Sequence, residues 1–133
     1  MFQLIKIQNG RIGVPEPQRI TLESAVEVTY GTPVIISGGV LTKLTDTATS
    51  LPTHLTLAST DGKDVLVAAI TPEMVFETTV NGDASSLTVG TEYLADATGL
   101  GIGTTVAASG KRGATVISVA SIENAVVTVC FKN

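Results

Sequence analysis

The stretch VGTEYLADATG, residues 89–99, places two carboxylates close together beside a tyrosine. Glu92 and Asp96 are four residues apart, so on one continuous strand both side chains would lie on the same face. Such a pair can supply an acid and a base when its surroundings push the two pKa values apart. However, Asp96 opens the sequence DATG, where an aspartate typically hydrogen-bonds to its own turn. We therefore predict that Asp96 caps a turn and that Glu92 is a solvated strand residue, with a contact between subunits as the alternative.

Three other short motifs resemble ligand-binding loops but lack part of the required pattern. The runs DGKD (61–64) and NGD (81–83) lack the alternating oxygen ligands and the closing glutamate of an EF-hand, so both are interpreted as turns. In GLGIG (99–103) the third glycine comes one position too early for a dinucleotide-binding loop, and a strand pattern follows instead of a helix. We expect these glycines to permit a tight bend where another backbone approaches.

The single cysteine and the single histidine are far apart in the sequence. Cys130 lies in the apolar run AVVTVCF and is predicted to be a small buried side chain. His54 is expected at the edge or the surface, where a strand begins. A small hydrolase would require Glu92, Asp96 and His54 to converge in one pocket. We predict that the protein is not an enzyme and that it uses no metal and no cofactor.

The composition limits the classes of partner. Charged residues make up only 15% of the 133-residue chain, so we expect Thr and Ser, or a partner chain, to cover part of the surface. The net charge is −4, and the densest basic run is Lys111-Arg112, which argues against direct nucleic-acid binding. No apolar run reaches the roughly 20 residues of a membrane span, and no secretory signal is visible. We therefore expect synthesis in a cytoplasm and no membrane partner.

Short strand patterns recur between turn signals about every 8–12 residues, which favours an all-β fold. We predict a compact β-sandwich or β-barrel-like domain of short antiparallel strands. Hairpins are expected around Ser37-Gly38-Gly39, around Asp61-Gly62 and between residues 113–120 and 124–131. Further strands are expected at 2–7, 11–14, 25–30 and 74–80.

The N-terminal region is predicted to be an extended arm. Residues 1–24 combine the strand-like run FQLIKI with the sequence VPEP, whose two prolines disfavour sheet pairing. FQLIKI could also pair with RIGV (11–14) across Asn9-Gly10. Residues 25–133 would then form the β-rich domain, and the arm would add a strand to a sheet edge of another chain.

The order of these signals carries a family resemblance. It includes YGTPVII (30–36), a glycine-rich turn with Val40-Leu41, LTVGTEYLAD (87–96), TTV (104–106), GATVISVA (113–120) and AVVTVCF (125–131). Over about the last hundred residues this pattern resembles the small β-rich capsid decoration, or cement, proteins of tailed bacteriophages.

The resemblance implies a structural virion protein without catalysis. Such a protein is made in the host cytoplasm, binds the outside of an icosahedral capsid as a homotrimer, and stabilises contacts between major capsid protein subunits. The side chains expected at capsid or subunit contacts are Phe2, Leu4, Ile5, Ile7, Pro15, Pro17 and Tyr93. The alternatives are another virion component (tail tube, fibre or head fibre) and a non-catalytic β-sandwich binding module.

Overall fold

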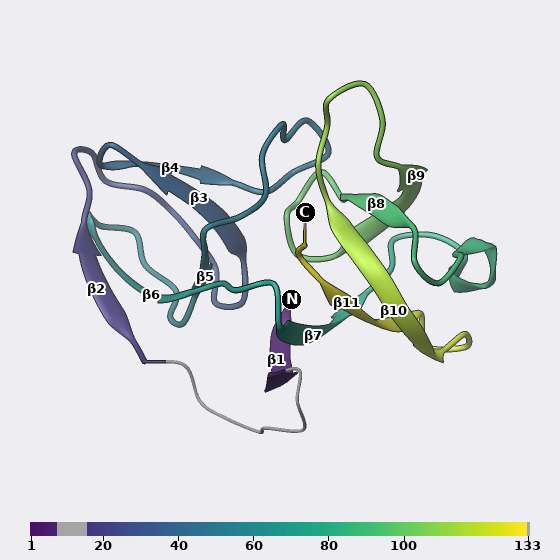
Figure 1. Cartoon of the computed structure of the whole chain (residues 1–133). Helices are drawn as coiled ribbons and strands as arrows, with labels where there is room; N and C mark the ends of the chain where they lie inside the picture. Colours follow the sequence, from purple (N-terminus) through teal and green to yellow (C-terminus); the bar gives the residue numbers. More distant parts are fainter. Residues whose placement is uncertain (8–15, 133) are drawn as a thin grey trace.

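The computed structural model describes residues 1–7 and 16–132, which form two antiparallel β-sheets packed together (Figure 1). The predicted all-β, sandwich-like fold is therefore confirmed. The strands are β1 (Gln3–Ile7), β2 (Gln18–Thr21), β3 (Pro33–Ser37), β4 (Val40–Lys43), β5 (His54–Thr56), β6 (Asp64–Ala69), β7 (Met74–Thr79), β8 (Glu92–Ala95), β9 (Ile102–Val106), β10 (Ala114–Ser121) and β11 (Val126–Cys130). One 3₁₀ turn, η1 (Ala84–Ser86), lies between β7 and β8.

The six-stranded sheet has the order β1-β7-β11-β10-β8-β9 and lies on the right in Figure 1. The predicted hairpin of residues 113–131 is confirmed as β10 and β11, which pair in the middle of this sheet. Val127 and Val129 of β11 are fully buried in the core between the sheets. Thr128, which lies between them in the sequence, points to the opposite side and is half-buried. This alternation is the period of two that a sheet with one solvated face requires.

The five-stranded sheet has the order β2-β6-β5-β3-β4 and curls at one end. Both hairpins predicted here are confirmed, because β3 pairs with β4 and β5 pairs with β6. The N–H of Glu23, two residues after β2, donates to the carbonyl of Gly39 in the β3–β4 turn at 2.9 Å. The two edges therefore meet and enclose a small second core of Leu22, Val28, Val65 and Val67.

The main core lies between the two sheets and includes residues from both. Leu44 and Leu55 come from the five-stranded side, and Phe76 and Phe131 come from the six-stranded side. The Phe2 ring lies with its centroid 5.6 Å from that of Phe131, and Phe76 lies 5.5 Å from Phe131 on another side. Burying each such side chain contributes roughly 1.5–3 kcal/mol.

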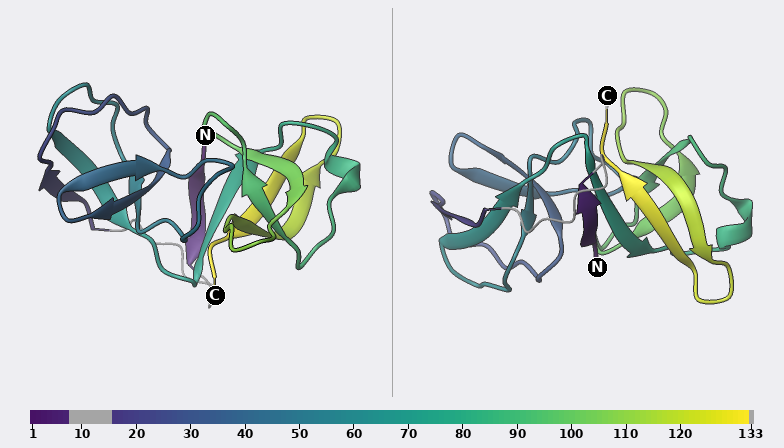
Figure 2. Two further views of the ribbon diagram at one scale, coloured as in Figure 1. Left: turned by 90° about the horizontal axis from the view of Figure 1, so that it is seen from above. Right: turned by 60° about the horizontal axis from the view of Figure 1, so that its bottom comes forward.

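The N-terminal segment is built into both sheets, in contrast to the arm predicted for residues 1–24. β1 pairs antiparallel with β7, and β2 pairs antiparallel with β6. Figure 2 shows β1 between the two halves of the molecule. The possible partner RIGV (11–14) lies outside the described residues. Sequence spacing suggested the nearest strand as a partner, but burial of Phe2 in the main core requires β1 to lie beside β7.

Residues 25–30, predicted as a strand, pair only locally: Val28 and Thr60 form an isolated antiparallel bridge, and the N–H of Val26 donates to the carbonyl of Gly62 at 3.0 Å. The alternation in AVEVTY is real, because Val28 is buried in the second core and Val26 packs against it. The segment covers the open end of the five-stranded sheet and is held there by short antiparallel pairing with residues 60–62.

Replacing Phe2 with alanine should lower the free energy of unfolding by roughly 3–5 kcal/mol, because the side chain is fully buried between the sheets. Urea denaturation followed by circular dichroism measures this change. The adjacent Gln3→Ala variant is the control, since Gln3 is exposed, and should change stability by less than about 0.5 kcal/mol. Equal losses in the two variants would contradict the assigned burial.

Candidate functional site

Glu92, at the start of β8, holds the segment before β10. Its Oε2 accepts from the Nε of Arg112 at 3.0 Å and from the backbone N–H of Gly113 at 2.6 Å. The Nη2 of Arg112 also donates to the carbonyl of Lys132 at 3.0 Å. Both charged side chains are about one quarter exposed, so the prediction that Glu92 is simply solvated is wrong. Its carboxylate ties β8 to the segment before β10, and Arg112 extends this link to the residue after Phe131.

Asp96 caps the turn after β8, as predicted. Its Oδ1 accepts from the N–H and the Oγ1 of Thr98, at 2.9 and 2.6 Å, and from the N–H of Gly99 at 3.0 Å. Gly99 has φ of +75°, which suits glycine. The two carboxylates of the opening motif therefore make separate structural contacts, one at each end of β8.

Tyr93 and Leu94 take opposite faces of β8. Tyr93 belongs to the main core, and its hydroxyl accepts from the N–H of Thr88 at 2.7 Å. Leu94 faces the other way and lies in the floor of a hollow, where it is 6% exposed. Neither side chain stands free on the surface.

The predicted contact residues are placed differently from one another. Phe2 and Tyr93 are buried in this chain's own core, and Leu4 is half-buried against it. Ile5 is 38% exposed, and Pro17 is exposed just before β2. Ile7 is the last residue of β1, and Pro15 lies outside the described residues. Among the members of the set whose side chains are described, Ile5 and Pro17 are therefore the exposed ones.

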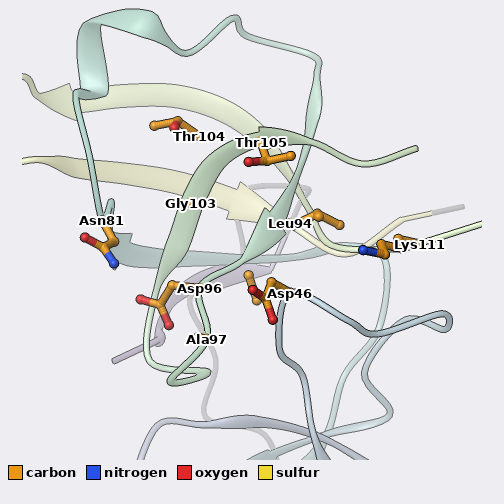
Figure 3. A pocket seen from close by; sticks show the side chains of 10 residues that line it. Asp46, Asn81, Leu94, Asp96, Ala97, Gly103, Thr104, Thr105 and Lys111 are labelled. Carbon is orange, nitrogen blue, oxygen red and sulfur yellow. The ribbon is translucent and has the colours of Figure 1, made fainter. Parts of the chain in front are cut away.

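A polar hollow of about 450 Å³ lies on the outer side of β8 and β9 (Figure 3). Leu94 and Gly103 form its floor, and its rim carries side chains from other segments. The lining residues are Asp46, Asn81, Leu94, Ala95, Asp96, Ala97, Gly103, Thr104, Thr105 and Lys111. Carboxylates, an amide, hydroxyls and one ammonium group can accept and donate hydrogen bonds, so the hollow suits contact with a polar group.

The sequence did not predict this hollow, because its residues come from five separate stretches of the chain. The loop that carries Asp46 is held close by the N–H of Arg112, which donates to the carbonyl of Ala48 at 2.9 Å. No local motif signals that contact. Asn81, Asp96, Gly103 and Lys111 all stand in motifs named above, but each for a separate local reason that does not bring them together.

The two calcium-like motifs are turns, as predicted. Asp83 caps η1, and its Oδ1 accepts from the Oγ and the N–H of Ser85 at 2.7 and 2.9 Å. These bonds, from the side chain and then the backbone of Ser85, lower the pKa of Asp83. The N–H of Gly62 donates to the Oγ1 of Thr60 at 3.2 Å in the turn before β6. Within residues 1–7 and 16–132, no three His, Cys, Asp or Glu side chains come together.

The glycines of residues 99–103 permit a close approach of two backbones, which confirms the expected bend. A Cβ at Gly101 would lie 2.6 Å from the carbonyl oxygen of Thr79. The backbone at Gly101 therefore packs directly against the end of β7.

Cys130 and His54 lie on different sheets. Cys130 is 5% exposed, and burial raises the pKa of its thiol. His54 begins β5 in the other sheet, where partial burial lowers its pKa and its Nδ1 lies 2.8 Å from the Oγ1 of Thr53.

No protein-family model matches the chain, and no curated protein is similar enough in sequence to count as a relative. In the part of the chain that is described, no helix is long and apolar enough to cross a membrane.

Replacing Asp96 with alanine should lower the free energy of unfolding by about 1–2 kcal/mol, because three hydrogen bonds to the turn lose their acceptor. Asp46→Ala is the matched control, since Asp46 lines the same hollow from an exposed loop, and should have an effect below about 0.5 kcal/mol. Thermal unfolding of both variants provides the comparison. A neutral Asp96→Ala variant would argue against the capping role.

Replacing Gly113 with alanine should destabilise the protein by more than about 2 kcal/mol, because the new Cβ would lie 2.0 Å from the carbonyl oxygen of Tyr93. Gly62→Ala is the control, because its nearest neighbour would lie at 3.8 Å and φ there is not positive. We expect that variant to be neutral or slightly stabilised, by up to about 1 kcal/mol. Urea midpoints of the two variants should therefore move far apart.

Proposed function

We propose that the protein is a structural virion component that binds the outside of an icosahedral phage capsid and stabilises contacts between major capsid protein subunits. The order of strand and turn signals in the sequence supports this proposal, together with one feature of the surface. That feature is the outer face of the six-stranded sheet.

The outer face is built from short side chains, of which few are charged. One cross-strand row runs through Gln3, Glu77, Thr128 and Ser118, and the next through Thr79, Val126 and Ser121. The hydroxyls of Ser118 and Thr128 lie 2.6 Å apart, which places both on this face. Glu77 is the one charged residue in these two rows. We name these two rows the outer face.

An outer face of this kind suits a permanent contact with another protein. Short hydroxyl side chains lose little conformational entropy when they are covered, and they need little desolvation compared with Lys or Glu. The centres of protein interfaces are depleted of charged residues for the same reason. We therefore place the capsid contact on the outer face, and the homotrimer implied by the family resemblance forms part of the proposal.

The polar hollow supports a second candidate, a non-catalytic binding module. In that case a small polar group or a side chain of another protein would occupy the space over Leu94. A tail tube, fibre or head fibre component is a third possibility, because the outer face would also suit contacts within those assemblies.

Co-sedimentation with undecorated capsids, assembled from the major capsid protein of the phage that encodes this chain, tests the proposal. The wild-type protein should pellet with the capsids at saturable stoichiometry. Ser118→Arg places a long charged side chain on the outer face and should weaken binding by at least about tenfold. Thr42→Arg, on exposed β4 of the other sheet, is the matched control and should bind normally.

Immunogold labelling of whole particles with an antibody against this chain separates the alternatives. Label over the head supports decoration, and label over the tail supports the tube or fibre assignment. Absence of label, combined with no co-sedimentation, would leave the binding module as the better explanation.

A further inference from the structure

The dipeptide Asn81-Gly82 lies between β7 and η1, and both of its residues are exposed. On its N-terminal side, the N–H of Asn81 donates to the carbonyl of Ile102 at 2.7 Å. On its C-terminal side, the side chain of Asp83 caps η1. Two fixed points therefore bracket the peptide unit that joins Asn81 to Gly82.

This peptide unit is itself held by no hydrogen bond from the described residues. Within residues 1–7 and 16–132, no acceptor is bonded to the N–H of Gly82 and no partner to the side-chain amide of Asn81. Gly82 has φ of +137°, and it has no Cβ to restrict rotation about its backbone bonds. A Cβ there would lie 2.8 Å from the Cγ2 of Thr104, so glycine keeps this space open.

An asparagine side chain can react with a peptide nitrogen that is accessible in this way. The nitrogen of Gly82 loses its proton and attacks Cγ of Asn81, so that a new C–N bond forms and the bond from Cγ to Nδ2 breaks. Ammonia leaves with that proton, and a succinimide ring remains. Water then opens the ring at one of its two carbonyls and gives aspartate or isoaspartate. No atom is oxidised or reduced.

We propose that Asn81 is a site of spontaneous deamidation in the folded protein, through a succinimide formed with the nitrogen of Gly82. Native hydrogen bonds normally slow such a reaction, because the peptide must first be released by local unfolding. At Asn81-Gly82 neither the attacking nitrogen nor the amide has to be released from a partner in the described structure. Both groups are also open to the water that completes the reaction.

Asn124 provides an internal comparison in the turn between β10 and β11. Its side chain is exposed as well, but the N–H of the next residue, Ala125, donates to the carbonyl of Ile122 at 3.2 Å. Ala125 also carries a Cβ and has φ of +53°, which restricts rotation of its backbone. Asn124 should therefore keep its amide while the protein is folded.

Deamidation would change both the charge and the backbone at the hollow. Asn81 lines the hollow together with Asp46 and Asp96, so its conversion adds a third carboxylate to the same space (Figure 3). In isoaspartate the main chain also runs through Cβ, which lengthens the link between the contact at Ile102 and η1 by one carbon. Asn81 belongs to neither row of the outer face, so the reaction is independent of the proposed capsid contact.

Peptide mapping of the full-length chain during incubation at neutral and mildly alkaline pH tests the proposal. Cleavage after glutamate places Asn81 in the peptide 78–92 and Asn124 in the peptide 124–133. Asn9, which lies outside the described residues, falls in the separate peptide 1–16. The same chain unfolded in guanidinium chloride serves as the reference for each site, so the intrinsic reactivity of each sequence cancels.

Unfolding should accelerate the reaction of Asn81 by less than about tenfold, and that of Asn124 by a much larger factor, because only the second site is protected by a hydrogen bond. Isoaspartate should appear beside aspartate at position 81, since both arise from the ring. Equal acceleration at the two sites, or an Asn81 that stays intact in the folded chain, would overturn the proposal. Aspartate without isoaspartate would exclude the succinimide.

Two variants separate the reaction from its consequence. Asn81→Gln keeps an amide, but its longer side chain closes the corresponding ring far more slowly, so its isoelectric point should not fall during incubation. Freshly prepared Asn81→Asp carries the new charge without the extra backbone carbon. The isoaspartate fraction of the aged wild type should unfold at a lower temperature than Asn81→Asp. Equal melting temperatures would contradict the inferred change in the backbone.

Discussion

The burial of Phe2 between the two sheets is the interaction on which the rest of the structure depends. The ring packs against Phe131 of the six-stranded side, while the N–H of Phe2 donates to the carbonyl of Gly31 at 2.8 Å on the five-stranded side. The carbonyl of Met1 accepts from the Oγ1 of Thr78 at 2.9 Å. One residue therefore fixes β1 in its sheet and holds the second sheet against it.

Threonine side chains contribute to the buried interior of the protein as well as to its surface. Thr32, Thr56, Thr78 and Thr115 are all buried. The hydroxyl of Thr56 donates to the carbonyl of Thr29 at 2.7 Å and accepts from the N–H of Thr32 at 2.9 Å. In the described part of the chain, every buried side-chain polar atom has a hydrogen-bond partner. Because these hydroxyls satisfy backbone groups in turns, the protein can join its sheets with few ion pairs, which explains how it folds with so few charges.

Features set by neighbouring residues could be predicted from the sequence, and features set by distant pairing could not. The hairpin at Ser37-Gly38-Gly39 and the cap at Asp96 follow from local turn chemistry, and both are confirmed. β1 pairs with β7, and Arg112 forms an ion pair with Glu92, in each case between segments far apart in the chain. No sequence motif predicts either contact. The hollow depends on five such stretches, so the local motifs that contain Asn81, Asp96 or Lys111 give no sign that these residues come together. The strand expected at residues 25–30 shows that alternation reports burial on one side, which a segment with only short local pairing also produces.

The contact between Phe2 and Phe131 has a consequence for the order of folding. It joins residues from opposite ends of the described chain, and β1 must wait for β7, which lies about seventy residues later, before it can pair. During synthesis the curled five-stranded sheet has all its strands available once β6 has emerged, while the main core stays incomplete until Phe131 follows. Contacts of such long range slow the search for the native state. The six-stranded half is therefore expected to close last, and until it does, its strand edges and apolar face are exposed to other nascent chains.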